Sequence, residues 1–186
     1  MNPETVYDFQ WDATKARSNE RKHDVRFEEA ASVFLDPLAL TVYDKSSSLD
    51  EERWFILGFD ARGRLLAVAH TYQISGIGSV RIRIVSGAKG HKTRAQLLRG
   101  SIGSDEAMNA TPTKPSHDED MPAEIDFSDG TRGKFYRPNS KLNMPVYLEV
   151  EVQAYLGQIA ARKGVSLSDV ANDLLKKEIA IIESAK

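Results

Sequence analysis

The apolar pattern of the chain is interrupted between Gly100 and Pro122. The sequence there reads GSIGSDEAMNATPTKPSHDEDMP, with glycine, serine, proline and acidic residues in place of regularly spaced apolar side chains. A segment of this composition cannot build a hydrophobic core and is typical of a flexible linker. For a chain of 186 residues we therefore expect two small domains, at 1–100 and 123–186, joined by a linker at 101–122.

The composition, 41% apolar and 28% charged, is that of a soluble globular protein. No apolar run approaches the roughly 18 residues of a membrane span, and the polar N-terminus lacks a secretory signal pattern, so we expect a cytoplasmic protein. The absence of cysteine excludes disulfides and thiolate chemistry. Residues 1–100 carry a net charge of +2 and residues 101–186 one of −4. Opposite charges suit two halves that dock on each other, although such small imbalances also arise by chance.

The first half changes from a helical to a strand pattern. Asp12 is a plausible N-cap for a helix over 13–23, and apolar residues at helical spacing predict a second helix at 27–34. We expect an α+β fold in which an antiparallel sheet of about four strands follows these helices and a terminal helix covers 89–98. β-branched and aromatic runs place the strands at 38–44, 53–59, 64–72 and 79–87.

The second half has a β-α-α pattern. Alternating apolar residues predict a half-buried strand over 141–148. A helix follows Glu149 and ends at Gly164, and Ser166 with Asp169 resembles a capping box for a last helix. One strand and two helices cannot close a core. We therefore expect a homodimer, or a higher even-numbered oligomer, formed by pairing strand with strand.

Four segments of the first half form an ordered set of motifs. They are FQWDATKARSNERKHDVRFEEAASVFLDP at 9–37, EER at 51–53, GRLLAVAHT at 63–71 and RIRIVSGAK at 81–89. Over residues 7–99 the chain resembles the BrnT family of type II toxins, which implies a RelE-like fold and a ribonuclease that stops translation. The family continues from the last strand as Ser, Ala, Arg, whereas this chain has Ser86, Gly87 and Ala88. The resemblance then implies an attenuated or inactive toxin, unless Lys89 stands in for the missing arginine.

RNA cleavage through the 2′-hydroxyl needs a base or a positioned hydroxyl, a proton for the leaving oxygen, and cations near the developing charge. Arg81 and Arg83 share one face of their predicted strand, although for a single arginine a solvated surface position is an equally good interpretation. His23 is better placed as a general acid than His70, which lies among apolar strand residues. We expect no cofactor and, because the histidines are scattered, no metal site. The candidate catalytic residues are Lys22, His23, Arg53, Arg81, Arg83 and Lys89.

The second half looks like the partner antitoxin of such a toxin, BrnA. IDFSDGTRGKFYRP at 125–138 precedes the strand, helix, helix order of a ribbon-helix-helix domain. We expect this segment to lie over the basic face of the toxin half and to block RNA, with an interface of Asp126, Phe127, Asp129, Phe135 and Tyr136. A paired ribbon would place Lys141, Asn143 and Tyr147 in a major groove of operator DNA, although the acidity of this half argues against strong DNA affinity.

Three functions agree with the sequence. The first is a toxin–antitoxin fusion whose metal-independent ribonuclease half is inhibited in cis, with RNA and operator DNA as partners and no membrane. The second is a DNA-binding transcriptional autorepressor that retains an inactive toxin half as a scaffold. The third is an oligomeric interaction module. Arg53, Arg81 and Arg83 in one cleft would favour the first, and side chains that diverge into solvent would favour the third.

Overall fold

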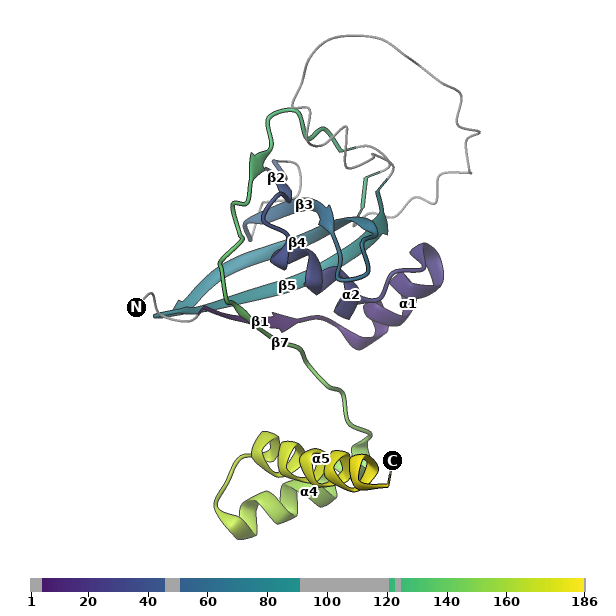
Figure 1. The fold of residues 1–186 in the computed structure, drawn as a ribbon, viewed down its shortest axis with the longest axis vertical. Coiled ribbons are helices and arrows are strands. Elements are labelled where there is room, and N and C mark those ends of the chain that lie inside the picture. Colours follow the sequence, from purple (N-terminus) through teal and green to yellow (C-terminus); the bar gives the residue numbers. More distant parts are fainter. Residues whose placement is uncertain (1–4, 46–50, 91–120, 123–124, 186) are drawn as a thin grey trace. The chain divides into compact units, whose positions relative to one another are not determined.

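The structure, a computed structural model, describes residues 5–45, 51–90, 121–122 and 125–185. The chain divides into two compact units, unit 1 over Met1–Pro145 and unit 2 over Val146–Lys186. The described residues form a mixed sheet and four α-helices, an α+β architecture (Figure 1). No helix among them is long and apolar enough to cross a membrane. The predicted division into a first domain at 1–100, a linker at 101–122 and a second domain at 123–186 stays a prediction.

Unit 1 is built on a seven-stranded sheet with the order β6-β2-β3-β4-β5-β1-β7. Strands β2 to β5 form the expected antiparallel meander, whereas β1 lies parallel to both β5 and β7. The sheet is therefore mixed rather than antiparallel, because the segment before the first helix buries Tyr7 and Phe9 and pairs as an inner strand. The strands are β1 (Val6–Gln10), β2 (Leu40–Tyr43), β3 (Arg53–Phe59), β4 (Leu65–Gly76), β5 (Ser79–Lys89), β6 (Thr131–Arg132) and β7 (Lys141–Asn143).

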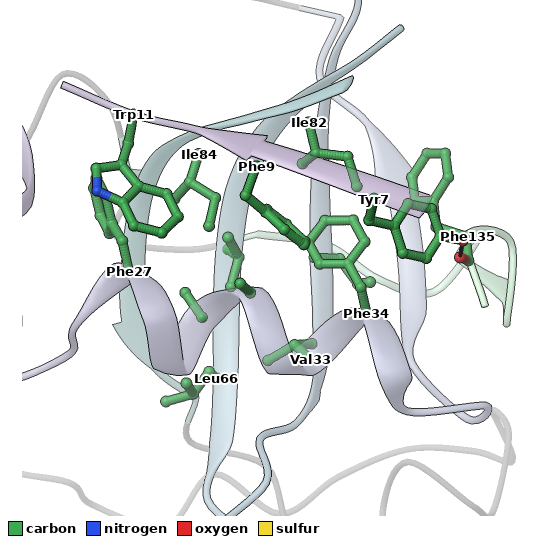
Figure 2. Close-up of a cluster of buried hydrophobic side chains, with 14 of the residues drawn as sticks. Tyr7, Phe9, Trp11, Phe27, Val33, Phe34, Leu66, Ile82, Ile84 and Phe135 are labelled. Carbon is green, nitrogen blue, oxygen red and sulfur yellow. Dashed lines mark hydrogen bonds between the residues drawn. The ribbon is translucent and has the colours of Figure 1, made fainter. Parts of the chain in front are cut away.

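Two helices and a 3₁₀ turn cover one face of this sheet, called the helix face here (Figure 1). They are α1 (Ala13–His23), α2 (Phe27–Ser32) and η1 (Val33–Leu35). Asp12 caps α1 as predicted, because its carboxylate accepts hydrogen bonds from the backbone N–H groups of Thr14 and Lys15 at 2.8 Å. Figure 2 shows the core of the helix face, in which aromatic rings from β1, α2 and η1 meet apolar side chains of β4 and β5.

A buried asparagine, Asn19, joins α1 to β5. Its amide nitrogen donates to the carbonyl oxygens of Val25 and Gly87, at 2.8 and 2.9 Å. Its amide oxygen accepts from the Gly87 N–H at 3.0 Å and from the Ser86 hydroxyl at 3.1 Å. Since all of these groups are buried, the four hydrogen bonds fix the position of α1 along β5.

Residues 125–143, called the strap here, add a strand to each edge of the sheet. β6 pairs antiparallel with β2, and β7 pairs parallel with β1 at the opposite edge. Between the two strands the strap runs from one edge of the sheet to the other (Figure 1). Two of its aromatic residues are buried on opposite faces. Phe135 belongs to the helix-face core (Figure 2), and Phe127 belongs to a second core on the other, outer face.

The strand expected over 141–148 is shorter than predicted. The Lys141 N–H donates to the Thr5 carbonyl oxygen at 2.9 Å, which starts the pairing with β1. Alternate residues of a strand direct their N–H groups to the same neighbour, so Asn143 is the next donor on this side and residue 145 would follow. Residue 145 is proline, which has no N–H, and β7 ends at Asn143. Of the terminal helix expected over 89–98, Lys89 belongs to β5 instead, and residues 91–98 lie outside the described residues.

Unit 2 consists of α4 (Val150–Lys163) and α5 (Leu167–Ser184). Both predicted caps are present: Gly164 ends α4 with φ of 65°, and Ser166 and Asp169 form a capping box at the start of α5. Among the described residues of this unit there is no strand. Its buried apolar residues are Leu156, Ala160 and Val170 alone, so the unit has very little core of its own.

Candidate functional site

A polar row crosses the outer face of the sheet. Arg53 of β3 pairs with Thr71 of β4, Thr71 with Arg83 of β5, and Arg83 with Gln10 of β1. Directly paired residues share a face, so these four side chains are neighbours across the sheet. Arg81 lies on the same face, two residues before Arg83. The residues between and after the two arginines are buried on the helix face, which confirms the predicted alternation of β5.

A pocket of about 460 Å³ lies at this row. It contains two guanidinium groups, two carboxylates and several neutral polar groups, a combination that can bind a phosphate and remove a proton. Arg83 forms an ion pair with Glu51. The Arg53 guanidinium forms an ion pair with the buried Asp44 at 3.3 Å. The residues that line the pocket are Gln10, Glu51, Glu52, Thr71, Tyr72, Gln73, Arg81 and Arg83.

A β-bulge in β5 separates Lys89 from the two arginines. Ile84 pairs with His70 and Ser86 with Ala69, so Val85 is an extra residue that shifts the alternation. Lys89 consequently pairs with Leu66, a residue of the helix-face core, while Ala88 belongs to the outer face. Lys89 therefore does not occupy the place that an arginine at position 88 would have.

Lys22, His23 and Lys89 form a second basic group, at the end of α1. The Lys89 ammonium donates to the Asp24 carboxylate at 2.6 Å, and this hydrogen bond holds the pKa of Asp24 below its usual range. Asp24 directly follows Lys22 and His23 as the C-cap of α1. Of the six candidate catalytic residues, Arg81 and Arg83 line the pocket, Arg53 lies beside it in the polar row, and these three lie apart.

Neither described histidine of this unit lines the pocket. His70 is fully buried on the helix face, where its ring makes T-shaped contacts with Phe34 and Phe135 at centroid distances of 4.8 and 5.2 Å. Burial lowers the pKa of His70 to about 3, so the ring is neutral at pH 7. A proton acceptor within the pocket must then be Glu51 or Glu52. Among the described residues no group of three or more histidines and carboxylates is arranged to hold a metal ion.

The two carboxylates of the pocket are not among the candidate residues predicted from the sequence. Glu51 and Glu52 directly precede Arg53 in the EER motif, so their proximity to the arginines is readable from the sequence. Gln10, Thr71 and Gln73 join the pocket only through the register of β1, β4 and β5. No periodicity along the chain reveals that register.

Phe135 is the main anchor of the strap. Its ring stacks on Tyr72 with a centroid distance of 4.4 Å and contacts Trp54 edge to face at 5.6 Å. Its carbonyl oxygen accepts a hydrogen bond from the Tyr7 hydroxyl, and burial raises the pKa of Tyr7 to about 12. The Lys134 ammonium lies 4.5 Å from the centroid of the Trp54 ring. These contacts fix the strap to the helix face.

The strap was expected to lie over the basic face of the sheet, but it does not cover Arg81 and Arg83. Phe135 is on the helix face because it follows β6, where the strap passes around the β2 edge of the sheet. Phe127 packs on the apolar half of the outer face, beside the polar row. Tyr136 is half-buried, and Asp129 is exposed. Asp126, also exposed, accepts a hydrogen bond from the Ser128 N–H at 2.8 Å.

The predicted DNA-binding residues are divided between the two units. Lys141 and Asn143 are exposed on β7, where they pair with Val6 and Asp8 of β1. Their side chains therefore lie on the outer face, the same face as Arg81. Tyr147 is exposed and belongs to unit 2.

Comparison with known proteins identifies the region that carries the pocket. Residues 11–93 match the family model described as "Ribonuclease toxin, BrnT, of type II toxin-antitoxin system". A solved structure of the ribonuclease toxin BrnT of Brucella abortus aligns with 46% of this chain and 99% of its own, with 15% sequence identity and a TM-score of 0.33. No curated protein matches the chain. The region that contains Arg53, Thr71 and Arg83 of the polar row is thus similar in sequence to the BrnT ribonuclease toxins of type II toxin–antitoxin systems.

Proposed function

We propose that the chain is a toxin–antitoxin fusion, in which a metal-independent ribonuclease half is restrained by an antitoxin half in the same chain. The observation that carries this proposal is the strap. It follows the region matched by the toxin family, adds a strand to each edge of its sheet, and buries one phenylalanine on each face. Strand addition combined with side-chain anchors is a general mode of peptide recognition, used here within one chain.

The pocket supplies the chemistry of RNA cleavage. Arg81 and Arg83 bind the phosphate, and their charge stabilises the phosphorane. Glu51 or Glu52 removes the proton of the 2′-hydroxyl, whose oxygen attacks phosphorus and displaces the 5′-oxygen. The products are a 2′,3′-cyclic phosphate and a 5′-hydroxyl, whose oxygen takes its proton from water as it leaves. Because Glu51 is paired with Arg83, the phosphate of RNA competes with this carboxylate for the Arg83 guanidinium.

The strap restrains the ribonuclease half by covering the surface beside Arg81 and Arg83, not the arginines themselves. Phe127, with Met121 and Ile125, covers the apolar half of the outer face, next to the polar row. Ala88, where the BrnT pattern has arginine, packs against this same cluster. RNA can then contact the pocket but not the adjoining surface. The tether adds to this restraint, since a segment within the same chain acts at an effective concentration of about millimolar.

The helical unit completes the antitoxin half. We assign residues 141–182 to a ribbon-helix-helix dimer that binds operator DNA through Lys141, Asn143 and Tyr147. The thin core of unit 2 supports dimerisation, because a unit of this size does not close a core alone. Residues 101–186 carry a net charge of −4, so we expect weak DNA affinity that falls steeply with salt.

Expression of residues 1–100 in a bacterium, compared with the full chain, tests the restraint. We expect the fragment to arrest growth and degrade RNA, the full chain to be tolerated, and residues 121–186 supplied as a second chain to restore growth. The matched control is the fragment with Arg81→Ala and Arg83→Ala, which should be harmless at equal soluble amount. Normal growth with soluble parent fragment would contradict an active toxin.

A DNA-binding autorepressor with an inactive toxin scaffold is the second candidate. It is favoured by Ala88 at the arginine position together with Lys89 on the opposite face. If this alternative is correct, expression of residues 1–100 is harmless. The full chain still binds DNA from its own promoter in an electrophoretic mobility shift assay.

A further inference from the structure

β7 brings two polar side chains of the strap onto the outer face of the sheet. Leu142 packs against the helix-face core, so Lys141 and Asn143 on either side of it lie on the opposite face, where both are exposed. β7 belongs to the same compact unit as the pocket. Its pairing with β1 therefore fixes where these two side chains lie relative to the arginines (Figure 1).

A second polar row, called the edge row here, runs beside the first one. Asn143 of β7 pairs with Asp8 of β1, Asp8 with Arg81 of β5, and Arg81 with Gln73 of β4. Asp8 is on the outer face because its two neighbours in β1 are buried in the helix-face core. Arg81 and Gln73 also line the pocket. The edge row therefore extends the polar surface of the pocket to β7.

The two rows together are long enough for several nucleotides of RNA. Strands β3, β4, β5, β1 and β7 are neighbours in this order, so the rows cross four strand spacings. At about 4.8 Å each, these spacings span roughly 19 Å, the length of about five stacked nucleotides at about 3.4 Å per nucleotide. RNA whose phosphate is bound by Arg81 and Arg83 can therefore reach β1 and β7 with a neighbouring nucleotide.

Asp8 and Asn143 suit the edge of a base better than a phosphate. A carboxylate repels phosphate and only accepts hydrogen bonds, whereas an amide can also donate one. Cytosine and adenine each present an amino group, which donates, beside a ring nitrogen, which accepts. Uracil has a carbonyl oxygen in place of the amino group, and this oxygen would face the Asp8 carboxylate. The pair therefore favours a base that carries an amino group at this position.

We propose that Asp8 and Asn143 form a base-recognition subsite of the ribonuclease pocket, which binds a cytosine or an adenine next to the phosphate held by Arg81. The Asp8 carboxylate accepts a hydrogen bond from the amino group, and the Asn143 amide donates one to the ring nitrogen. Lys141 binds a flanking phosphate. This inference rests on the ribonuclease of the proposed function. It adds that the antitoxin half contributes to RNA recognition as well as to restraint.

Two RNA probes that differ only in the base test the subsite on the full chain. They are short oligonucleotides of 2′-O-methylcytidine and of 2′-O-methyluridine, which cannot be cleaved because the attacking 2′-hydroxyl is blocked. Fluorescence anisotropy at low salt measures their affinities. We expect the cytosine probe to bind about tenfold more tightly than the uracil probe, as for one good pair of contacts to a base edge.

Asp8→Asn separates base recognition from charge. If Asp8 acted through its charge alone, the variant would bind both probes more tightly by the same factor, and the ratio of the two affinities would not change. We instead expect the two affinities to become nearly equal, with the uracil probe bound more tightly than by the parent. Asn143→Ala should lower the affinity for the cytosine probe about fivefold and leave that for the uracil probe unchanged.

Lys141→Ala and Lys134→Ala are a matched pair of lysine variants in the strap. Lys141 lies on the outer face, whereas Lys134 lies over the Trp54 ring on the helix face. Lys141→Ala should weaken the binding of both probes equally. It should also reduce the slope of log affinity against log salt by about 0.7, as for one phosphate contact on a single strand. Lys134→Ala should keep the affinities and the slope of the parent.

Several outcomes would overturn the inference. They are equal affinities of the parent for the two probes, a preference for cytosine that persists in Asp8→Asn, or equal losses in the two lysine variants. A Lys141→Ala variant that binds RNA like the parent but loses affinity for duplex DNA from its own promoter would assign β7 to DNA instead.

The inference and the proposed function can fail separately. A toxic 1–100 fragment, found together with any of the outcomes above, would reject the subsite and leave the proposed ribonuclease standing. A harmless soluble fragment would reject the active ribonuclease. The subsite would then stand as an RNA-binding site if the full chain prefers the cytosine probe and Asp8→Asn removes that preference.

Discussion

Unit 1 and unit 2 have unequal hydrophobic cores although both carry ample apolar sequence. In unit 1 the sheet has a core on each face, and each core contains one phenylalanine of the strap. In unit 2 two helices enclose three buried residues and leave most of their apolar side chains exposed. The chain itself thus covers the apolar side chains of unit 1 but leaves those of unit 2 exposed, and the dimer proposed above would cover them.

Removing the main anchor of the strap should have the largest effect on unit 1. Phe135→Ala deletes a buried ring that contacts Tyr72, Trp54 and His70, and we expect the free energy of unfolding to fall by about 3–5 kcal/mol. The half-buried neighbour provides the control, since Tyr136→Ala should cost about 1 kcal/mol. Urea unfolding followed by tryptophan fluorescence measures both. Equal effects of the two variants would mean that the strap is not an integral part of the core.

Acid should weaken unit 1 through His70. Its pKa is lowered to about 3 in the folded chain by burial, from an ordinary value near 6.5, so protonation favours the unfolded state. The contribution to stability is complete above pH 6.5 and is lost as the pH falls toward 3. Between pH 7 and 5 we expect the parent to lose about 2 kcal/mol more than His70→Gln, which cannot be protonated. Identical pH profiles would show that His70 is accessible to protons in the folded state.

Dilution should distinguish the two units. If α4 and α5 are stabilised by a second copy, a tenfold dilution lowers the stability of that assembly by about 1.4 kcal/mol, whereas unit 1 is unaffected. Thermal unfolding at several protein concentrations, followed by helical circular dichroism and by tryptophan fluorescence, separates the signals because both tryptophans lie in unit 1. Met144→Asp with Val146→Asp should abolish the concentration dependence. A parent whose helices unfold at one temperature at every concentration would contradict an obligate partner.

The smallest effect is expected from one hydroxyl group. Tyr7→Phe removes the hydrogen bond from β1 to the Phe135 carbonyl oxygen and should lower the free energy of unfolding by about 1 kcal/mol. Tyr43→Phe, at a position that is 40% exposed, is the control and should change little. If both changes are silent, the Tyr7 hydroxyl does not hold the strap.

Local sequence patterns predicted most elements of the fold. The caps at Asp12, Gly164 and Ser166 and the meander from β2 to β5 follow from residue types at fixed spacing. The parallel position of β1 and the separate edges taken by β6 and β7 depend on pairing between distant segments. Such pairing is set by the packing of Tyr7 and Phe135 into a shared core, which no local pattern encodes.

The site was predictable only in part, for a related reason. Alternation along β5 placed Arg81 and Arg83 on one face. The family resemblance suggested that Lys89 stands in for a missing arginine beside them, but the bulge at Val85 shifts the alternation and places Lys89 on the other face. A bulge is a response to the neighbouring strand and leaves little trace in the sequence of the strand that carries it.

Hydrogen exchange of the full chain tests most directly whether the strap is a built-in part of the sheet. We expect the backbone amides of β6 and β7 to exchange slowly, in the same range as those of β2 and β1 with which they pair, and the Phe135 segment to be protected with them. Exchange of residues 125–143 at the rate of an unstructured peptide, while β3 and β4 remain protected, would contradict this expectation.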